Sequence, residues 1–250
     1  MKYLITLVAC VPLVASHGFV QNATIGGKYY DPYQDPYMNP TPQRISREIQ
    51  GNFPVENVTF KDIECGGNTT GGIFGSKPAA LHAPAAAGST VNLRWTLWAE
   101  SHQGPLITYM ARCPDSGCND YQTNGTPVWF KIAEDGLHST NADWLKNQWA
   151  DTPLMTYPNE GVNYVIPSCL KPGYYLVRHE IIALHGAYKE GGAQFYPGCH
   201  QLKISGSGMT VPSLGLVSFP GAYNSKDPGI LYSQYNELPY TIPGPAVFKC

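Results

Sequence analysis

The chain has 250 residues, of which only 14% are charged, against about 25% in average soluble domains. Its 43% hydrophobic and 12% aromatic residues can build one large core, and all-β domains of roughly this length are commonly single units. The formal net charge of −2 provides no basic field for nucleic acid or for an anionic membrane, so both are excluded as partners.

The chain begins with an apolar run over residues 3–15, directly after Lys2. The run is shorter than the roughly 20 residues that span a bilayer, and small residues precede His17 at the positions that signal peptidase recognises. We predict that residues 1–16 are a cleaved signal peptide and that residues 17–250 form one secreted domain. The alternative, a buried N-terminal strand, is disfavoured by the proline inside the run.

The cysteines agree with secretion, because removal of the signal peptide leaves six of the seven. Six cysteines in an oxidising compartment allow up to three disulfides, with 15 possible connectivities. Cys113 and Cys118 bracket a short turn and form the easiest local bridge. Asn-x-Ser/Thr sequons, which are candidate glycosylation sites, occur at Asn22, Asn57, Asn68 and Asn124.

Short β-rich runs separated by turn residues follow along the chain. They cover residues 88–100, 106–113, 127–134, 161–167, 174–184, 200–208 and 211–219. No segment keeps a 3.6-residue apolar period, so we predict an all-β sandwich or barrel with minor helix near residues 141–147. The segment 29–51 is rich in Tyr, Pro, Asn and Asp and predicts a long functional loop. No Ser/Thr/Pro-rich tether precedes Cys250, so we expect no carbohydrate-binding module.

Nitrogen ligands for a metal are the chemistry that the residues themselves favour. Cleavage before His17 would free an α-amine with a pKa of about 7.7–8.0 next to the imidazole of the same residue, which together form a bidentate chelate. His179 and His185 in RHEIIALH are six residues apart, whereas a zinc-protease HExxH motif needs four. The local spacing of the acidic residues singles out no catalytic pair, and the sequence has no GxSxG motif. A glycoside hydrolase is therefore kept only as the less favoured alternative.

Several long motifs occur in a fixed order between His17 and Pro245. They are HGFV, SHQGPLITYMARC, FKIAEDGL, KPGYYLVRHEIIALHGA, GAQFYPGC, DPGI and YTIPGP. Together they strongly resemble fungal lytic polysaccharide monooxygenases of auxiliary activity family 9, formerly grouped as glycoside hydrolase family 61. The resemblance implies an immunoglobulin-like (fibronectin-III-like) antiparallel β-sandwich, with long loops that carry a flat substrate face.

The resemblance also implies a site for one copper ion. Its ligands would be the amine and ring of His17, the ring of His102 and, axially, Tyr196, with His185 and Gln194 beside the open coordination position. Three nitrogens in a near-tetragonal array suit Cu(II). Gln194 and Tyr196 are two residues apart, a spacing that points both side chains to the same face when the segment is a strand. Both can face the metal.

By the same resemblance, Tyr37 and Tyr235 are the candidates for a flat sugar-binding surface, since aromatic rings stack on the apolar faces of sugars. The family pattern further suggests two disulfides, Cys65–Cys199 and Cys113–Cys118. Cys169 and Cys250 are then left over and are expected to join.

The function implied is that of a secreted, monomeric, copper-dependent enzyme. It would cleave β-1,4-glucans such as cellulose oxidatively at C1 and/or C4, with an external electron donor and O2 or H2O2. The alternatives are an extracellular copper-binding protein with the same histidine brace but no glycan oxidation, and the glycoside hydrolase.

Overall fold

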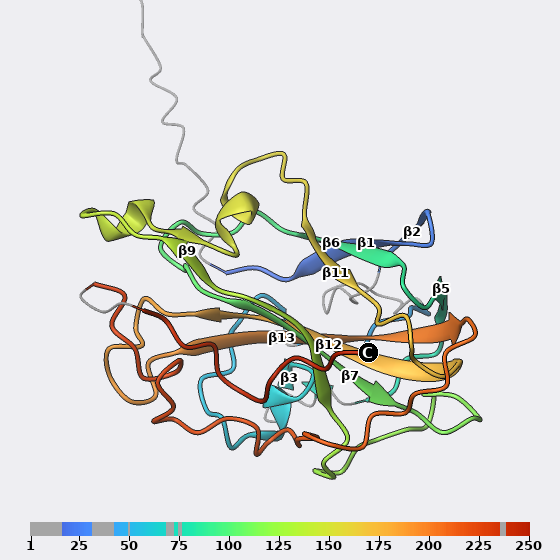
Figure 1. The fold of residues 1–250 in the computed structure, drawn as a ribbon. Coiled ribbons are helices and arrows are strands. Elements are labelled where there is room, and N and C mark those ends of the chain that lie inside the picture. The colour runs from blue at the N-terminus through green and yellow to red at the C-terminus, as the bar shows by residue number, and fades with distance from the viewer. Residues whose placement is uncertain (1–16, 32–42, 50, 69–72, 75–76, 236–238) are drawn as a thin grey trace, which may run out of the picture.

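The computed structural model describes residues 17–31, 43–49, 51–68, 73–74, 77–235 and 239–250. Two β-sheets are layered on each other (Figure 1). The smaller sheet is antiparallel, with the strand order β11-β6-β1-β2. Its strands are β11 (Val162–Val165), β6 (Thr90–Trp95), β1 (Val20–Ile25) and β2 (Lys28–Tyr30).

The larger sheet has five strands in the order β5-β13-β12-β7-β8. They are β5 (Ala83–Ala86), β13 (Gln194–Ser205), β12 (Gly173–Ala183), β7 (Leu106–Arg112) and β8 (Phe130–Asp135). All neighbours pair antiparallel except β13 and β5, which are parallel. The predicted antiparallel sandwich is therefore confirmed in its architecture, with one parallel pair at the edge.

The remaining elements are short and lie in the connections. Two small ladders are formed by β3 (Gly67–Asn68) with β4 (Ile73–Phe74) and by β9 (Leu137–Ser139) with β10 (Gln148–Trp149). Three 3₁₀ turns, η1 (Lys61–Ile63), η2 (Trp144–Lys146) and η3 (Thr152–Met155), are the helical elements of the described residues. The minor helix predicted near residues 141–147 is thus η2. None of the described helices is long and apolar enough to cross a membrane.

Two of the predicted segments differ in the structure. Residues 211–219 form no strand and contribute a single bridge, from Val217 to Trp129. Pro212 lacks an N–H for a ladder and Gly215 lies at φ +66°, so the run is interrupted. The predicted loop over residues 29–51 is only partly a loop. Its first residues belong to β2, and residues 43–49 run alongside β13, with a bridge from Ser46 to His200. Residues 32–42 and 50 lie outside the described part.

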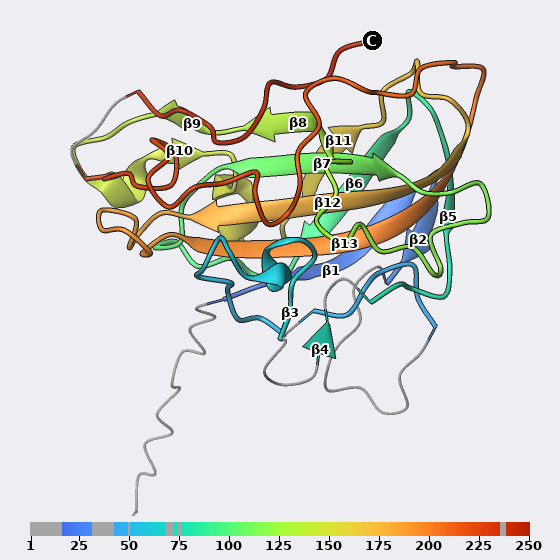
Figure 2. The same cartoon turned by 90° about the horizontal axis from the view of Figure 1, so that it is seen from below.

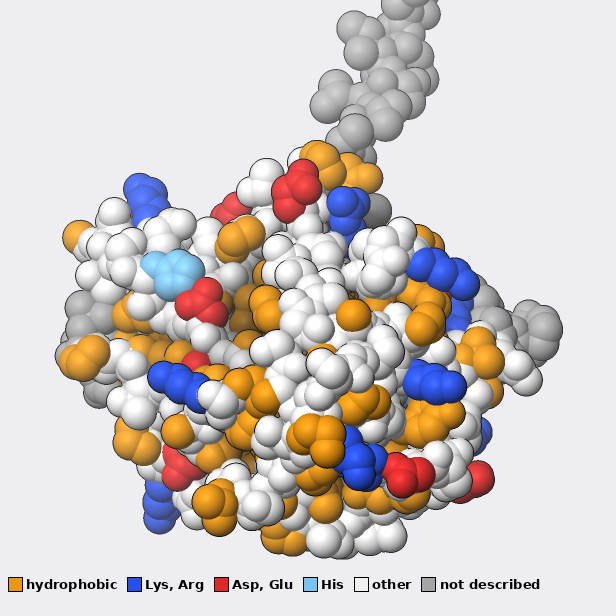
Figure 3. Space-filling model, turned by 45° about the vertical axis from the view of Figure 1, so that its right-hand side comes forward, with side chains coloured by type: hydrophobic (Ala, Val, Ile, Leu, Met, Phe, Trp, Pro, Cys, Tyr) orange, Lys and Arg blue, Asp and Glu red, His pale blue; other side chains and the backbone are white. Residues whose placement is uncertain are grey.

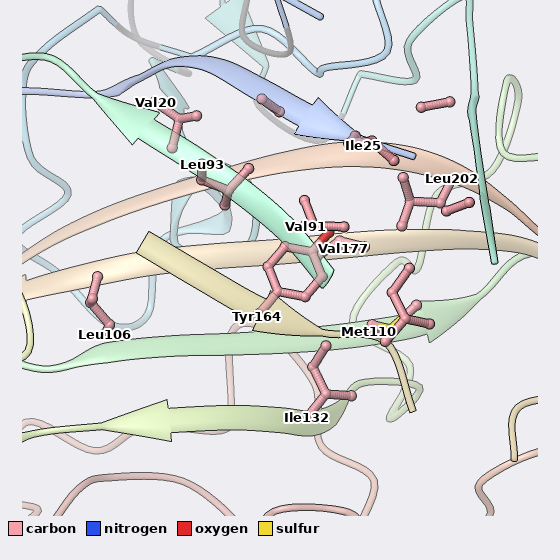
Figure 4. Close-up of a cluster of buried hydrophobic side chains, with 14 of the residues drawn as sticks. Val20, Ile25, Val91, Leu93, Leu106, Met110, Ile132, Tyr164, Val177 and Leu202 are labelled. Atoms are coloured by element: carbon pink, nitrogen blue, oxygen red, sulfur yellow. The ribbon is translucent and has the colours of Figure 1, made fainter. Parts of the chain in front are cut away.

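The main core lies between the two sheets because alternate residues of their strands point inward. In β6, for example, Val91, Leu93 and Trp95 are buried while their neighbours are not. They pack with Val177 and other side chains of the larger sheet (Figure 4).

A second core covers the other face of the larger sheet, which explains why β12 and β13 are buried on both faces. The loops after β13 run along this outer face (Figure 2). On the face of the molecule drawn in Figure 3, the charged side chains are scattered among neutral and hydrophobic ones.

Three disulfides are present, of which one joins a loop to β13 and two join segments outside the strands. They are Cys65–Cys199, Cys113–Cys118 and Cys169–Cys250, with Cα–Cα distances of 5.0, 5.3 and 5.6 Å. These are the pairs that the family resemblance suggested, together with the pair left over. The last one joins the C-terminal residue to the segment that precedes β12.

A buried ion pair, Arg178–Glu180, lies in the second core on β12. Both side chains are fully buried, and Arg178 also donates two hydrogen bonds to the carbonyl oxygen of Ile63, at 3.1 and 2.7 Å. Its guanidinium carbon lies 3.9 Å from the centre of the Phe219 ring. The Tyr223 hydroxyl donates a hydrogen bond to the Glu180 carboxylate, so the charges are held by a complete set of partners.

We expect Glu180→Ala to lower the free energy of unfolding by about 3–5 kcal/mol, because the Arg178 charge would stay buried without its counter-ion. Chemical denaturation at neutral pH measures this loss. Asp115→Ala is the matched control, since Asp115 pairs with Arg112 with 80% of its side chain exposed, and such pairs are worth about 0–1 kcal/mol. Equal losses in the two variants would contradict the expectation.

Candidate metal centre

The centre lies at one end of the sandwich, where β1 begins, β12 ends and β13 begins (Figure 1). His17 precedes β1, and His102 lies in the turn that leads into β7. Their ring centres are 5.5 Å apart and the ring planes meet at 78°. The two imidazoles are therefore close to perpendicular and can offer nitrogen lone pairs to one shared ion.

The turn that carries His102 is fixed through its backbone. The backbone N–H of His102 donates to the carbonyl of Ala99 at 2.9 Å, and the backbone carbonyl of His102 accepts from the indole N–H of Trp98 at 3.0 Å. The same indole N–H also donates to Asp151, at 2.9 Å, and the Ser101 hydroxyl lies 3.0 Å from Nδ1 of His102. The His102 ring is thus held in place before any metal binds.

Close packing of Gly104 sets the path of this turn. A Cβ atom on Gly104 would lie 1.8 Å from the carbonyl oxygen of Ile182, so the backbone would have to move. We expect Gly104→Ala to cost about 1–3 kcal/mol of stability and to weaken copper binding by displacing His102, measured by thermal unfolding and copper titration. Gly125→Ala is the control: nothing lies within 4 Å of its added Cβ, but its φ of +74° strains an alanine, so stability should fall while copper affinity stays unchanged.

Tyr196 and Gln194 reach the centre from the first residues of β13. The Tyr196 ring centre lies 6.0 Å from that of His17 and 6.4 Å from that of His102. Its hydroxyl donates to Oε1 of Gln194 at 2.9 Å, as expected for two residues on the same face of a strand. Trp98 packs edge-on against Tyr196, with ring centres 4.9 Å apart.

His185 completes the group just after β12. Its ring centre is 4.1 Å from that of His102, and its buried Nδ1 has no hydrogen-bond partner among the described residues. The structure therefore brings together all five residues that were predicted for the metal ligands and their neighbours.

Burial sets the protonation of these groups. It lowers the pKa of His102 to about 4, with His185 and His17 acting in the same direction, and it also lowers the pKa of His17 and His185. These lowered pKa values favour the neutral imidazoles, which are the form that binds a metal. Burial, followed by the charge of Glu56, raises the pKa of the Tyr196 phenol, which leaves it protonated.

This donor set fits copper. Neutral imidazoles suit Cu(II), which heads the affinity order for nitrogen ligands, and the protonated phenol of Tyr196 could add a weak oxygen donor. The described residues contain no group of three or more His, Cys, Asp or Glu side chains arranged for a metal. A centre built from two histidines and the free amine of His17 would require no such group.

Two further side chains at the centre had no signal in the sequence. Nε2 of Gln194 donates to Oε1 of Glu56 at 3.4 Å, and the Phe53 ring centre is 5.8 Å from that of His17. Both belong to a loop without a recognisable motif, and only the folded chain places them here.

Exposed aromatic side chains flank the centre next to His185. Tyr235 is 43% exposed, and its hydroxyl donates to the His185 carbonyl at 2.9 Å. Trp144 in η2 packs edge-on against Tyr235, with ring centres 5.0 Å apart, and the Tyr188 ring centre is 6.1 Å away. The other predicted surface residue, Tyr37, lies outside the described residues.

The other histidines and the sequons lie elsewhere. His179 bonds to Thr108, His200 to Tyr164, His82 to the N–H of Cys118 and His138 to Asp135. These four have structural partners, as expected. Asn22 is half-exposed on β1, Asn57 and Asn124 are exposed in loops, and Asn68 ends β3.

Fold and site together define a β-sandwich protein with a histidine pair and a tyrosine at one open end. The family model of Auxiliary Activity family 9 (formerly GH61) matches residues 17–241. Two curated relatives, the AA9 family lytic polysaccharide monooxygenases C and F of Podospora anserina, are 50% and 53% identical to this chain. Each alignment covers 100% of this chain, and 99% and 100% of the two relatives.

Solved structures agree. A cellulose-active polysaccharide monooxygenase from M. thermophila superposes with a TM-score of 0.79 at 32% identity, over 93% of this chain and 99% of the other. The extended catalytic domain of LPMO9A from H. jecorina gives 0.79 at 34% identity, over 92% and 90%. The chain belongs to auxiliary activity family 9. It is a lytic polysaccharide monooxygenase, which confirms the predicted class of enzyme.

Proposed function

We propose that the mature protein is secreted and cleaves cellulose or a related β-1,4-glucan by oxidation at C1 and/or C4. The observation that carries the proposal is the near-perpendicular His17–His102 pair with Tyr196 beside it, at an end of the sandwich where His17 and His185 are half-exposed. Exposed aromatic rings adjoin this centre. A relative of the same fold is described as cellulose-active.

The residues that would hold one copper ion are His17, through its amine and ring, His102 and Tyr196. When bound, copper supplies the one-electron chemistry by which an external donor and O2 or H2O2 can oxidise a sugar carbon. The amine becomes available only after residues 1–16 have been removed. In this proposal the metal site can therefore be completed only when the signal peptide is cleaved during secretion.

His185 and Gln194 control the space beside the ligands. The amide oxygen of Gln194 accepts the hydrogen bond of the Tyr196 hydroxyl, and one of its two N–H groups reaches Glu56, which leaves the other N–H for a further acceptor. Nδ1 of His185 has no partner within the described part of the chain. Both side chains can give hydrogen bonds to an oxygen co-substrate and so hold its protons in place.

The test is a digestion of cellulose by the copper-loaded mature enzyme, with and without a reductant, read by mass spectrometry of the released oligosaccharides. We expect oxidised chain ends that depend on the reductant and disappear with EDTA. Purely hydrolytic products would overturn the proposal in favour of a hydrolase. Copper binding without oxidised products would favour an extracellular copper-binding protein.

A further inference from the structure

The segment that holds Phe53 and Glu56 is fastened directly beside the metal centre. Val55 pairs with Phe195 through two backbone hydrogen bonds, at 2.8 and 2.9 Å. Phe195 is the residue between Gln194 and Tyr196 on β13. Because Val55 is buried, its neighbour Glu56 points away from the core and reaches Gln194.

Phe53 presents an apolar ring to solvent next to a proposed metal ligand. It is 54% exposed, its ring centre lies 5.8 Å from that of His17, and it lines a small cleft with Gly18 and Tyr196. A phenylalanine ring forms no hydrogen bonds with water, so its exposure to solvent is unfavourable. An apolar surface of this kind fits the C–H face of a sugar ring.

Glu56 adds hydrogen-bond capacity at the same place. Its carboxylate accepts from the Gln194 amide at 3.4 Å, and it forms no ion pair with the residues that the structure describes. A carboxylate has about four acceptor positions, so Glu56 can accept further O–H donors. A neutral polyhydroxylated ligand supplies such donors, whereas a ligand with its own carboxylates would be repelled.

We propose that Phe53 and Glu56 form a sugar-binding subsite on the His17 side of the metal centre. This inference rests on the proposed function and makes it more specific. Phe53 stacks on a sugar ring of the glucan, and Glu56 accepts a hydrogen bond from one of its hydroxyls. Tyr235, beside His185, provides the second contact, so the glucan chain passes over the metal ligands. The subsite selects neutral glucans over polysaccharides with acidic sugars.

The experiment measures binding of cellohexaose to the copper-loaded mature protein by calorimetry without a reductant, so that no turnover occurs. We expect Phe53→Ala and Glu56→Gln each to weaken binding about three- to tenfold, since such contacts are worth roughly 0.5–1.5 kcal/mol. Phe53→Tyr, which keeps the ring, should restore the affinity. Thermal unfolding and the copper spectrum should stay as in the wild type.

Tyr29→Ala is the matched control, because Tyr29 is 60% exposed but pairs with Thr24, near the end of β1 that lies away from His17. Its loss should leave cellohexaose binding unchanged. Wild-type affinity in both Phe53→Ala and Glu56→Gln would overturn the subsite while leaving the proposed function intact. A wild-type protein that neither binds nor oxidises a glucan would overturn the proposed function itself.

Discussion

A single alanine added before His17 is expected to weaken copper binding by more than about a hundredfold and to abolish the release of oxidised oligosaccharides. In the extended chain the nitrogen of His17 belongs to a peptide bond, where its lone pair is delocalised and no longer available to a metal. The bidentate chelate becomes a single imidazole. Loss of a neighbouring group that only orients a ligand typically costs about 10–100-fold in metal affinity, so loss of a ligand atom costs more.

The measurement compares two proteins that differ only at this terminus, one beginning at His17 and one with the additional residue. Copper titration and product analysis are done on both, and thermal unfolding of the metal-free proteins checks the fold. The metal-free proteins should unfold alike, because His17 precedes β1 and pairs with no strand. Unchanged copper affinity and activity in the extended protein would rule out the proposed use of the amine.

The residues that the structure brings together at the candidate metal centre could be singled out from the sequence because they lie in long, specific motifs. His102 is in SHQGP, His185 ends RHEIIALH, and Gln194 and Tyr196 are in QFYPGC. Each motif also carries the residues that hold its own backbone. Gly104, for example, allows the turn after His102 to pass within van der Waals distance of Ile182. The local sequence and the position of the functional group are therefore coupled.

The flanks of the site could not be predicted in the same way. Glu56 and Phe53 reach the centre because Val55 pairs with Phe195, which lies 140 residues further along the chain. No local pattern encodes a single bridge between distant segments. The contact between Trp144 and Tyr235 is of the same kind.

Hydrophobicity alone misled the strand prediction at residues 211–219. Leu214 in this run is 88% exposed, and Pro212 and Gly215 prevent a ladder from extending beyond the bridge at Val217. The parallel pairing of β5 with β13 was also not foreseen, because β-rich runs do not reveal which edge a short strand will join.

Two groups of residues at the centre, one around His102 and one around Gln194, are held by different hydrogen bonds. We therefore expect them to respond differently to substitution. His102 is fixed by Ser101, Ala99 and Trp98 independently of Gln194. Tyr196 depends on Gln194, whose amide also reaches Glu56. Changes at His102 should therefore act on metal affinity, and changes at Glu56 and Gln194, which are not proposed metal ligands, should act mainly on the substrate and on oxygen chemistry.

His102→Ala is expected to have a similarly large effect on copper binding. This substitution removes one of the three proposed nitrogens, so we expect copper affinity to fall by more than about a hundredfold and oxidised products to be lost. The fold should survive, because the turn is held by backbone contacts and by Trp98 rather than by the imidazole. Copper titration, electron paramagnetic resonance of the Cu(II) form and product analysis measure the three consequences.

His138→Ala serves as the control for the loss of a histidine as such. His138 is about half exposed, pairs with Asp135 at the end of β8 and is not among the residues proposed to hold copper, so its removal should leave copper affinity and products unchanged. A His102→Ala protein that binds copper as tightly as the wild type would show that the ion is held elsewhere. Loss of binding in both variants would instead point to general unfolding, which the thermal transition of each protein detects. Only loss in His102→Ala alone assigns the ligand, because both variants remove one imidazole from the same chain.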